Sequence, residues 1–311
     1  MKENQNKIIP LTRDFMFSAV FNNEENISIL EEFLSEYLEM DLSDIRGHLK
    51  LLSRKHLGEK KKDAKTEVDI LLSQSNGDKI IIEMNANGFY DNVKKRNLIY
   101  AAKTLAREYK EGDDELKNVH SVLQINFNTK TSKFGEYKLE KLINEFVLTE
   151  LTNSKIKYSN LLKIDVIDMA KANDIGYNYV NKKEEIIGSW CRMISTSNIE
   201  ELRKEGKKIM RDDTLNKLTK KVEELSSDDE MIELEGVLSK RELAHIAEIE
   251  EATNKGYNAG VQRGYDSGIK EGQEKERQII KNMLTKGMSN EEIEQLTGIT
   301  VSEQQELLQK Y

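Results

Sequence analysis

The sequence predicts a mixed α/β core followed by a mainly α-helical C-terminal half, and three observations support this fold class. Two apolar runs, residues 68–72 and 80–84, flank an Asn-Gly pair, which is the strongest short-range signal of a β-hairpin. A helical pattern at residues 90–109 is followed by a strand-like run at 119–127. From position 183 onward the apolar spacing is helical almost throughout, and the chain has one proline where average usage would give ~15.

Two helices are expected before the first strand. Thr12 is placed to cap the first helix, whose apolar residues recur at helical spacing. These residues are Phe15, Met16, Ala19 and Val20. The second helix follows a break at Asn22-Asn23 and carries its apolar residues on one face. They are Ile27, Leu30, Phe33, Leu34, Tyr37 and Leu38.

The hairpin and the helix at 90–109 lead into further strands, expected at residues 119–127, 146–148 and 162–167. The order helix, hairpin, helix, strand is typical of a mixed α/β core.

A glycine stands at every fourth position between Gly256 and Gly272. In a helix these five glycines cost roughly 5 kcal/mol relative to alanine. Two interpretations stay open: a semi-flexible helical connector, or a seam at which two helices approach closely. Beyond the repeat, residues 279–284, 289–296 and 301–308 predict a small helical tail, in which Ser289 and Glu292 match a capping box.

The net charge of −8 hides a strong asymmetry along the chain. Residues 46–65 contain eight Lys or Arg and two acidic residues, whereas residues 223–235 contain seven acidic residues and no basic one. Each run taken alone is consistent with a solvated surface. A face that binds a polyanion requires basic residues gathered around a reactive groove. Overall acidity therefore does not exclude nucleic acid as a partner.

Secretion and membrane insertion are not expected from the sequence. No apolar stretch approaches the ~20 residues that a membrane span needs. The first ten residues, MKENQNKIIP, lack the apolar core of a signal peptide. A single cysteine, Cys191, excludes an intramolecular disulfide and any zinc site built on several thiolates. These features predict a soluble cytoplasmic protein.

One acidic side chain lies near the end of each hairpin strand. Glu83 and Asn85 share a face of their strand because they are two residues apart. Asp69 joins that face if it stands opposite Glu83, a register that closes with a three-residue loop, Ser75-Asn76-Gly77, with glycine in the left-handed conformation. The two carboxylates would then converge.

Two converging carboxylates repel each other and favour a bound cation. Together with water and a phosphate oxygen they suit octahedral Mg²⁺. An ion held by Asp69 and Glu83 would polarise a scissile phosphate and acidify a bound water. Asn85, beside them, would orient that water. The alternative, an edge hairpin with exposed acids, stays open on spacing alone.

Further residues resemble a known family. The segment 12–17 (TRDFMF), with Phe21 and residues 23–26 (NEEN), resembles the opening of the Rpn family of recombination-promoting nucleases and putative transposases. Residues 69–70 and 82–85 resemble its two active-site strands. Arg96 and Tyr100 resemble its Arg-x-x-x-Tyr helix, and the glycine repeat and residues 298–300 (GIT) also recur there.

This family belongs to the PD-(D/E)XK nuclease superfamily. The resemblance implies a restriction-endonuclease-like core, Mg²⁺-dependent endonuclease activity on DNA, and an association with recombination or mobile elements. It implies a nuclease-like domain at 1–180, a helical region at 181–254, a glycine-rich helical connector at 255–275 and a helical tail at 276–311.

The resemblance also assigns roles to residues. Asp69 and Glu83 would bind the metal, and Asn85 stands where the superfamily has lysine and this family usually has glutamine. Asp14 matches the aspartate of the family's first helix, and would support the metal site or cap local backbone.

Supporting or DNA-binding roles fall to Lys65 in the basic segment, to Arg96 and to Tyr100; for the last two a structural role stays open.

Two further functional hypotheses stay open: a catalytically degenerate nuclease acting as a DNA-binding or assembly module, and a helix-mediated regulatory or scaffolding protein. Because duplex DNA has two strands, double-strand cleavage favours a homodimer or higher homo-oligomer, with the glycine repeat as its candidate seam.

Overall fold

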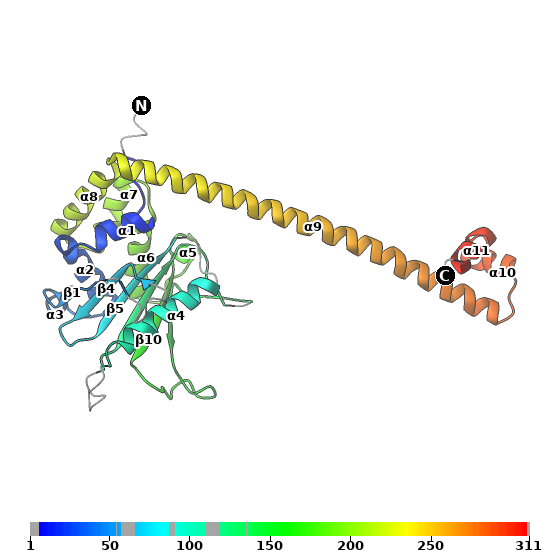
Figure 1. Cartoon of the computed structure of the whole chain (residues 1–311), viewed down its shortest axis with the longest axis horizontal. Helices are drawn as coiled ribbons and strands as arrows, with labels where there is room; N and C mark the ends of the chain where they lie inside the picture. The colour runs from blue at the N-terminus through cyan, green and yellow to red at the C-terminus, as the bar shows by residue number, and fades with distance from the viewer. Residues whose placement is uncertain are drawn as a thin grey trace. The chain divides into compact units, whose positions relative to one another are not determined.

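The computed structural model describes residues 6–53, 55–56, 66–86, 91–109, 119–134 and 136–309. The chain divides into two compact units, Met1–Glu235 and Gly236–Tyr311. The first unit contains a six-stranded sheet with helices, and the second is helical (Figure 1). The predicted mixed α/β fold with a mainly helical C-terminal region is therefore confirmed. The domain boundaries predicted at residues 180, 254 and 275 stay predictions.

The main sheet has the strand order β1-β4-β5-β6-β10-β9. Its strands are β1 (Leu49–Leu51), β4 (Ile70–Gln74), β5 (Lys79–Asn85), β6 (Val122–Asn128), β9 (Ile143–Val147) and β10 (Leu162–Asp168). The neighbours β5, β6 and β10 run parallel, whereas the pairs β1–β4, β4–β5 and β9–β10 are antiparallel. Two small ribbons pair β2 (Lys55–His56) with β3 (Thr66–Glu67), and β7 (Lys133–Phe134) with β8 (Tyr137–Lys138).

Helices cover both faces of the sheet. Helix α4 (Asp91–Ala106) lies against one face, and α1 (Asp14–Phe21) and α2 (Ile27–Leu38) lie on the other side (Figure 1). The further helices are η1 (Glu24–Asn26), α3 (Leu42–Ile45), α5 (Met169–Ala172), α6 (Lys182–Ser195), α7 (Ile199–Gly206), α8 (Asp212–Ser226) and α9 (Asp229–Thr285).

The two faces of the sheet differ in polarity. On the α1–α2 side the core is large and apolar, and Phe33 contacts both Phe127 and Trp190, with ring centroids 5.5 and 5.4 Å apart. Burying each such side chain contributes about 1.5–3 kcal/mol. On the α4 side the apolar cluster is small. It consists of Val68, Leu71, Ile81, Tyr100, Ala101 and Val122. The carboxyl ends of β5 and β6 lie beyond this small cluster and carry buried polar residues instead.

The β4–β5 hairpin has the predicted loop. The Gln74 amide donates to the Asp78 carbonyl at 2.8 Å, which leaves Ser75, Asn76 and Gly77 as the three-residue loop. Gly77 has φ +95°, and a Cβ there would also clash with the His120 ring. Glycine is therefore required at this position for two reasons.

The expected cap of the first helix is wrong. Helix α1 begins at Asp14, and its N-cap residue is Arg13, with no side-chain capping bond, rather than Thr12. The Arg13 guanidinium instead binds Glu235, with Nη2 and Oε1 2.8 Å apart. This contact joins residues 222 positions apart, so a local pattern cannot reveal it.

The second unit contains the remainder of α9, α10 (Asn290–Thr297) and α11 (Val301–Gln309). The capping box of Ser289 and Glu292 is confirmed, and Gly298 ends α10 at φ 75°. All five repeat glycines lie within α9, as expected for a helix. No described helix is both long and apolar enough to cross a membrane.

Candidate active site

Two carboxylates face each other across the β4–β5 hairpin. Ile70 pairs with Ile82, so the antiparallel register, continued by one residue, sets Asp69 opposite Glu83, as the sequence predicts. Each carboxylate accepts a backbone bond from the other strand. The Asp69 amide donates to Glu83 Oε1 at 3.1 Å, and the Met84 amide donates to Asp69 Oδ2 at 2.8 Å. These reciprocal bonds fix both acidic side chains where β4 begins.

The environment of Glu83 disfavours its negative charge. The residue is only 2% exposed, lying on the sheet face covered by α4. Burial, and next the neighbouring charge of Asp69, raise the pKa of Glu83 to about 8, whereas Arg96 acts in the opposite direction. Without a cation, the site therefore favours a protonated Glu83 at neutral pH. A bound cation would offset the mutual repulsion.

Asn85 lies two residues further along β5 and is 4% exposed. Its Oδ1 accepts a bond from Arg96 Nη2 at 3.0 Å, and its Nδ2 donates to Asn128 Oδ1 at 2.8 Å. Both ends of the carboxamide are thus engaged by neighbouring side chains. Arg96 comes from α4, which packs on β5, β6 and β10, and its own side chain is exposed.

Two further predicted residues lie in the same electrostatic environment. Asp14, exposed at the first position of α1, has a raised pKa through local desolvation, opposed by Arg96 and Arg13. Tyr100, one turn after Arg96, is 8% exposed, and the Arg96 guanidinium lies 5.9 Å from its ring centroid. Burial raises the pKa of Tyr100.

Lys65 and four further basic residues of the predicted segment, Arg54, Lys60, Lys61 and Lys62, lie outside the described residues, so the structure does not place them.

A row of buried polar residues continues from Asn85 across the sheet. Asn128 Nδ2 donates to Ser132 Oγ at 2.8 Å, and the Ser132 amide donates to Asp168 Oδ2 at 3.1 Å. Asn128, Ser132 and Asp168 are each 0% exposed. Sequence reasoning missed this row. A signal was present, because Gln124, Asn126 and Asn128 repeat at the two-residue period of one strand face.

The donor set of the carboxylate pair fits a hard divalent cation. It consists of carboxylate oxygens, which Mg²⁺ prefers, and it lacks the thiolate and imidazole ligands typical of zinc. Among the described residues, no group of three or more His, Cys, Asp or Glu side chains is arranged to hold a metal. An ion here would therefore take its remaining oxygens from water and substrate.

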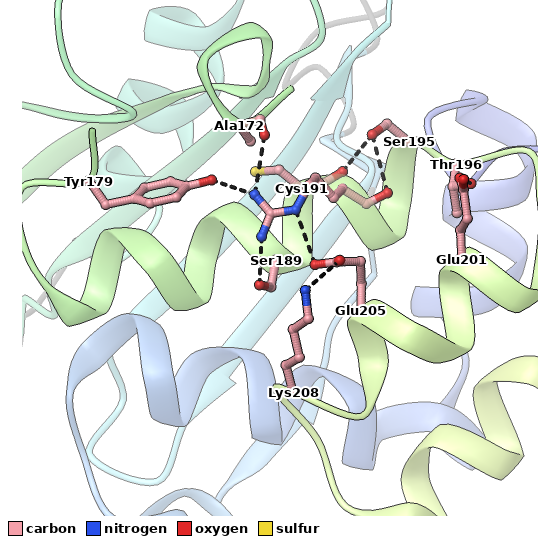
Figure 2. A network of polar contacts seen from close by, with 10 residues as sticks. Ala172, Tyr179, Ser189, Cys191, Ser195, Thr196, Glu201, Glu205 and Lys208 are labelled. Atoms are coloured by element: carbon pink, nitrogen blue, oxygen red, sulfur yellow. Dashed lines mark hydrogen bonds and ion pairs between the residues drawn. The ribbon is translucent and has the colours of Figure 1, made fainter. Parts of the chain in front are cut away.

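A second polar cluster lies on the helices of the first unit (Figure 2). The Arg192 guanidinium donates to Ala172 O at 3.2 Å, to Ser189 Oγ at 2.9 Å and to Glu205 Oε2 at 3.1 Å, and it also binds the Tyr179 hydroxyl. A cavity of about 480 Å³ opens beside it. Its lining includes Asn173, Ser195, Thr196, Glu201 and Lys204. Arg192 itself is held by protein groups on several sides.

The mixed sheet and the facing acids of its hairpin define an α/β protein with the core layout of a nuclease of the PD-(D/E)XK class. The family model described as "PD-(D/E)XK nuclease family transposase" matches residues 11–252, more than three quarters of the chain. The protein therefore belongs to this family, which confirms the resemblance seen in the sequence. No curated protein and no solved structure matches the chain.

Proposed function

We propose that this protein is a divalent-metal-dependent endonuclease that hydrolyses phosphodiester bonds in DNA, with Mg²⁺ as its ion. Membership of a nuclease and transposase family supports a nuclease-like or transposase-like role. The observation that carries the finer proposal is the pair Asp69 and Glu83, because two acids meet there and burial disfavours the charge of Glu83. A role in recombination or mobile-element movement is proposed on the family alone.

In this proposal Asp69 and Glu83 hold the ion by their carboxylate oxygens. When bound, the ion would polarise the scissile phosphate and lower the pKa of a bound water. Asn85 lies beside this pair, with its carboxamide bound to Arg96 and Asn128. A water oxygen forms the new bond to phosphorus and releases a proton to solvent, while the bond to one ester oxygen breaks and that oxygen takes up a proton from solvent. Asp14 at the rim would support the site through its charge.

The DNA backbone would lie along the exposed basic residues of α4, Lys95 and Arg96, together with Lys94 and the basic segment that includes Lys65. Contacts between lysine or arginine and phosphate are salt-sensitive and largely indifferent to sequence. A cytoplasmic location, expected from the sequence, stays part of this proposal.

The experiment is an incubation of supercoiled plasmid with the full-length protein and Mg²⁺, followed on agarose gels. Nicked or linear product is expected from the wild type and none from Glu83→Ala. Glu140→Ala is the matched control, because Glu140 is an exposed acid in the same unit. If Glu83→Ala cuts as fast as Glu140→Ala, the assignment of the site is wrong.

A second candidate function is a degenerate nuclease that binds DNA without cutting it. Asn85 favours this candidate, because it brings no positive charge where the superfamily has lysine. It predicts that the wild type retards DNA on a gel but leaves it intact with every divalent ion. If the wild type neither binds nor cuts DNA, the scaffolding role would be the hypothesis that remains.

We also propose a homodimer or higher homo-oligomer that pairs through α9. Apart from adjacent residues and the backbone of α9 itself, no described atom lies within 4 Å of the position that a Cβ would take at any of the five repeat glycines. The residues that follow four of them, Tyr257, Val261, Tyr265 and Ile269, are 43–72% exposed. The helix therefore presents a stripe of glycines beside a stripe of larger side chains. Leucine at positions 260 and 264 is expected to lower the mass measured by light scattering.

A further inference from the structure

The site lacks the lysine of the superfamily, and the described structure offers a different cation beside the carboxylates. Arg96 extends from α4, and its charge acts on both Glu83 and Asp14, lowering the pKa of each against the effect of burial. The geometry agrees, because Arg96 Nη2 lies 3.0 Å from Oδ1 of Asn85, which stands two residues after Glu83 on the same face of β5. Arginine binds phosphate with several N–H donors in a fixed fork, and it stays charged at any working pH.

A directed chain of hydrogen bonds holds this guanidinium. Arginine can only donate, so the oxygen of the Asn85 carboxamide must face Arg96 and its nitrogen must face Asn128. The same logic orients Asn128, which accepts from Asn85 and donates to Ser132 Oγ. Because the members after Arg96 are buried, each orientation is enforced by the cost of leaving a polar group unpaired.

The chain uses one Arg96 nitrogen, Nη2, on Asn85. The side chain remains exposed, unlike Asn85, Asn128 and Ser132. An arginine anchored on a buried network but open to solvent is suited to meet a charged group that arrives from outside. A phosphate bound by the neighbouring carboxylate site through an ion would be such a group.

We propose that Arg96 is a catalytic residue that binds the scissile phosphate and supplies the positive charge missing at Asn85, and that Asn85 and Asn128 are positioning residues for it. This inference rests on the proposed nuclease function and adds the group that stabilises charge on the phosphate. Preorganised donors of this kind lose little by reorganisation when the charge develops.

The test measures single-turnover cleavage of supercoiled plasmid in Mg²⁺ by Arg96→Gln, Arg96→Lys and Lys95→Gln. Lys95 is the matched control, since it is an exposed cation on the same helix and loses the same charge. We expect a loss of at least ~100-fold for Arg96→Gln, because removal of one preorganised donor costs about 10²–10³ in rate. Arg96→Lys should recover part of the rate, and Lys95→Gln should lose only the rate that its weaker binding of DNA accounts for.

Two binding measurements distinguish a catalytic role of Arg96 from a role in DNA binding alone. Duplex DNA affinity, measured by fluorescence anisotropy with Ca²⁺ in place of Mg²⁺, should fall equally in Arg96→Gln and Lys95→Gln. Mg²⁺ affinity without DNA, measured by calorimetry, should be equal or higher in Arg96→Gln, because a cation next to the carboxylates has been removed. A residue needed only for folding would weaken metal binding instead.

Asn128→Asp tests the positioning role. A carboxylate at this position can still accept the bond from Asn85, so the cleavage rate should exceed that of Asn128→Leu, which cannot. If neither variant folds, the Arg96 series decides the proposal by itself.

Several results would overturn the inference. They are an Arg96→Gln rate equal to that of Lys95→Gln, a rate loss matched by the loss of DNA affinity, and weakened Mg²⁺ binding in Arg96→Gln. A wild type that leaves plasmid intact would overturn the proposed function, and this inference with it, whereas a cutting wild type with an unimpaired Arg96→Gln overturns this inference alone.

Discussion

The carboxylate pair of the hairpin and the Arg192 cluster are both polar, yet they treat charge in opposite ways. Arg192 forms an ion pair with Glu205, which also binds Lys208. The other nitrogens of the Arg192 guanidinium donate to oxygens of Ala172 and Ser189 (Figure 2). Opposite charges are matched within the protein. At the hairpin two acids face each other instead, and burial together with the charge of Asp69 raises the pKa of Glu83. A matched cluster serves the fold, whereas an unmatched pair is suited to capture an ion.

The largest expected effect comes from a substitution in the hairpin pair, which tests whether these acids serve activity rather than folding. Glu83→Gln keeps the shape of the side chain and the acceptor for the Asp69 amide, but it removes an anion from the site. We expect a cleavage loss of about 10³-fold or more, because metal-held charge stabilisation supplies several kcal/mol. The melting temperature should stay the same or rise, because folding no longer has to bury a carboxyl group and hold it protonated above its ordinary pKa.

Asp69→Asn should likewise lose cleavage activity without a fall in melting temperature. The readouts are plasmid cleavage and calorimetric melting of the same preparations. A fall in melting temperature that parallels the lost activity would mean that the acids serve the fold, and the contrast with Arg192 would disappear.

The opposite outcome is expected at the Arg192 cluster. Arg192→Leu leaves Glu205 and three further acceptors without their donor, which should destabilise the first unit by about 2–3 kcal/mol. Urea unfolding measures this, and the cleavage rate per folded molecule should not change.

Arg203→Leu is the control for that experiment, because Arg203 pairs with Glu200 and Glu223 through largely exposed side chains. Its expected cost is below ~1 kcal/mol. Equal costs at positions 192 and 203 would show that the Arg192 cluster contributes no more than a surface ion pair.

A divalent ion should act on one of the two regions alone. At ten times its dissociation constant, Mg²⁺ should stabilise the wild type by roughly 1.4 kcal/mol, since it binds the folded state. Glu83→Gln should lose this gain and Arg192→Leu should keep it. Differential scanning fluorimetry with Mg²⁺ or EDTA gives the answer, and an equal shift in all three proteins would place the ion elsewhere.

The smallest expected effect concerns α9. If Gly260 and Gly264 face solvent in the working protein, Gly→Ala at each should stabilise the helix by about 1 kcal/mol. If a second copy packs against them, the same change should weaken self-association and cancel that gain. Thermal unfolding together with sedimentation distinguishes the two cases.

Local features of the sequence predicted much of the fold. The hairpin register followed from two apolar runs and an Asn-Gly signal, because a turn of fixed length sets which residues stand opposite. The helices of the C-terminal half followed from apolar spacing and a capping box. The cap at Thr12 was wrong because Arg13, bound to a distant glutamate, takes that position.

The amino-acid sequence by itself determined that Asp69 and Glu83 stand opposite each other, because residues joined by a short hairpin have no other partner within reach. Only the tertiary structure decided what surrounds them. Arg96 and Asn128 meet Asn85 from 11 and 43 positions away, and Glu205 meets Arg192 from 13. These contacts depend on how α4 packs on the parallel strands β5, β6 and β10 and on how α6 packs on α7. A periodic pattern can show which face of a strand a residue takes, but it does not show which residue of another element it will meet, since that partner is fixed by the packing geometry.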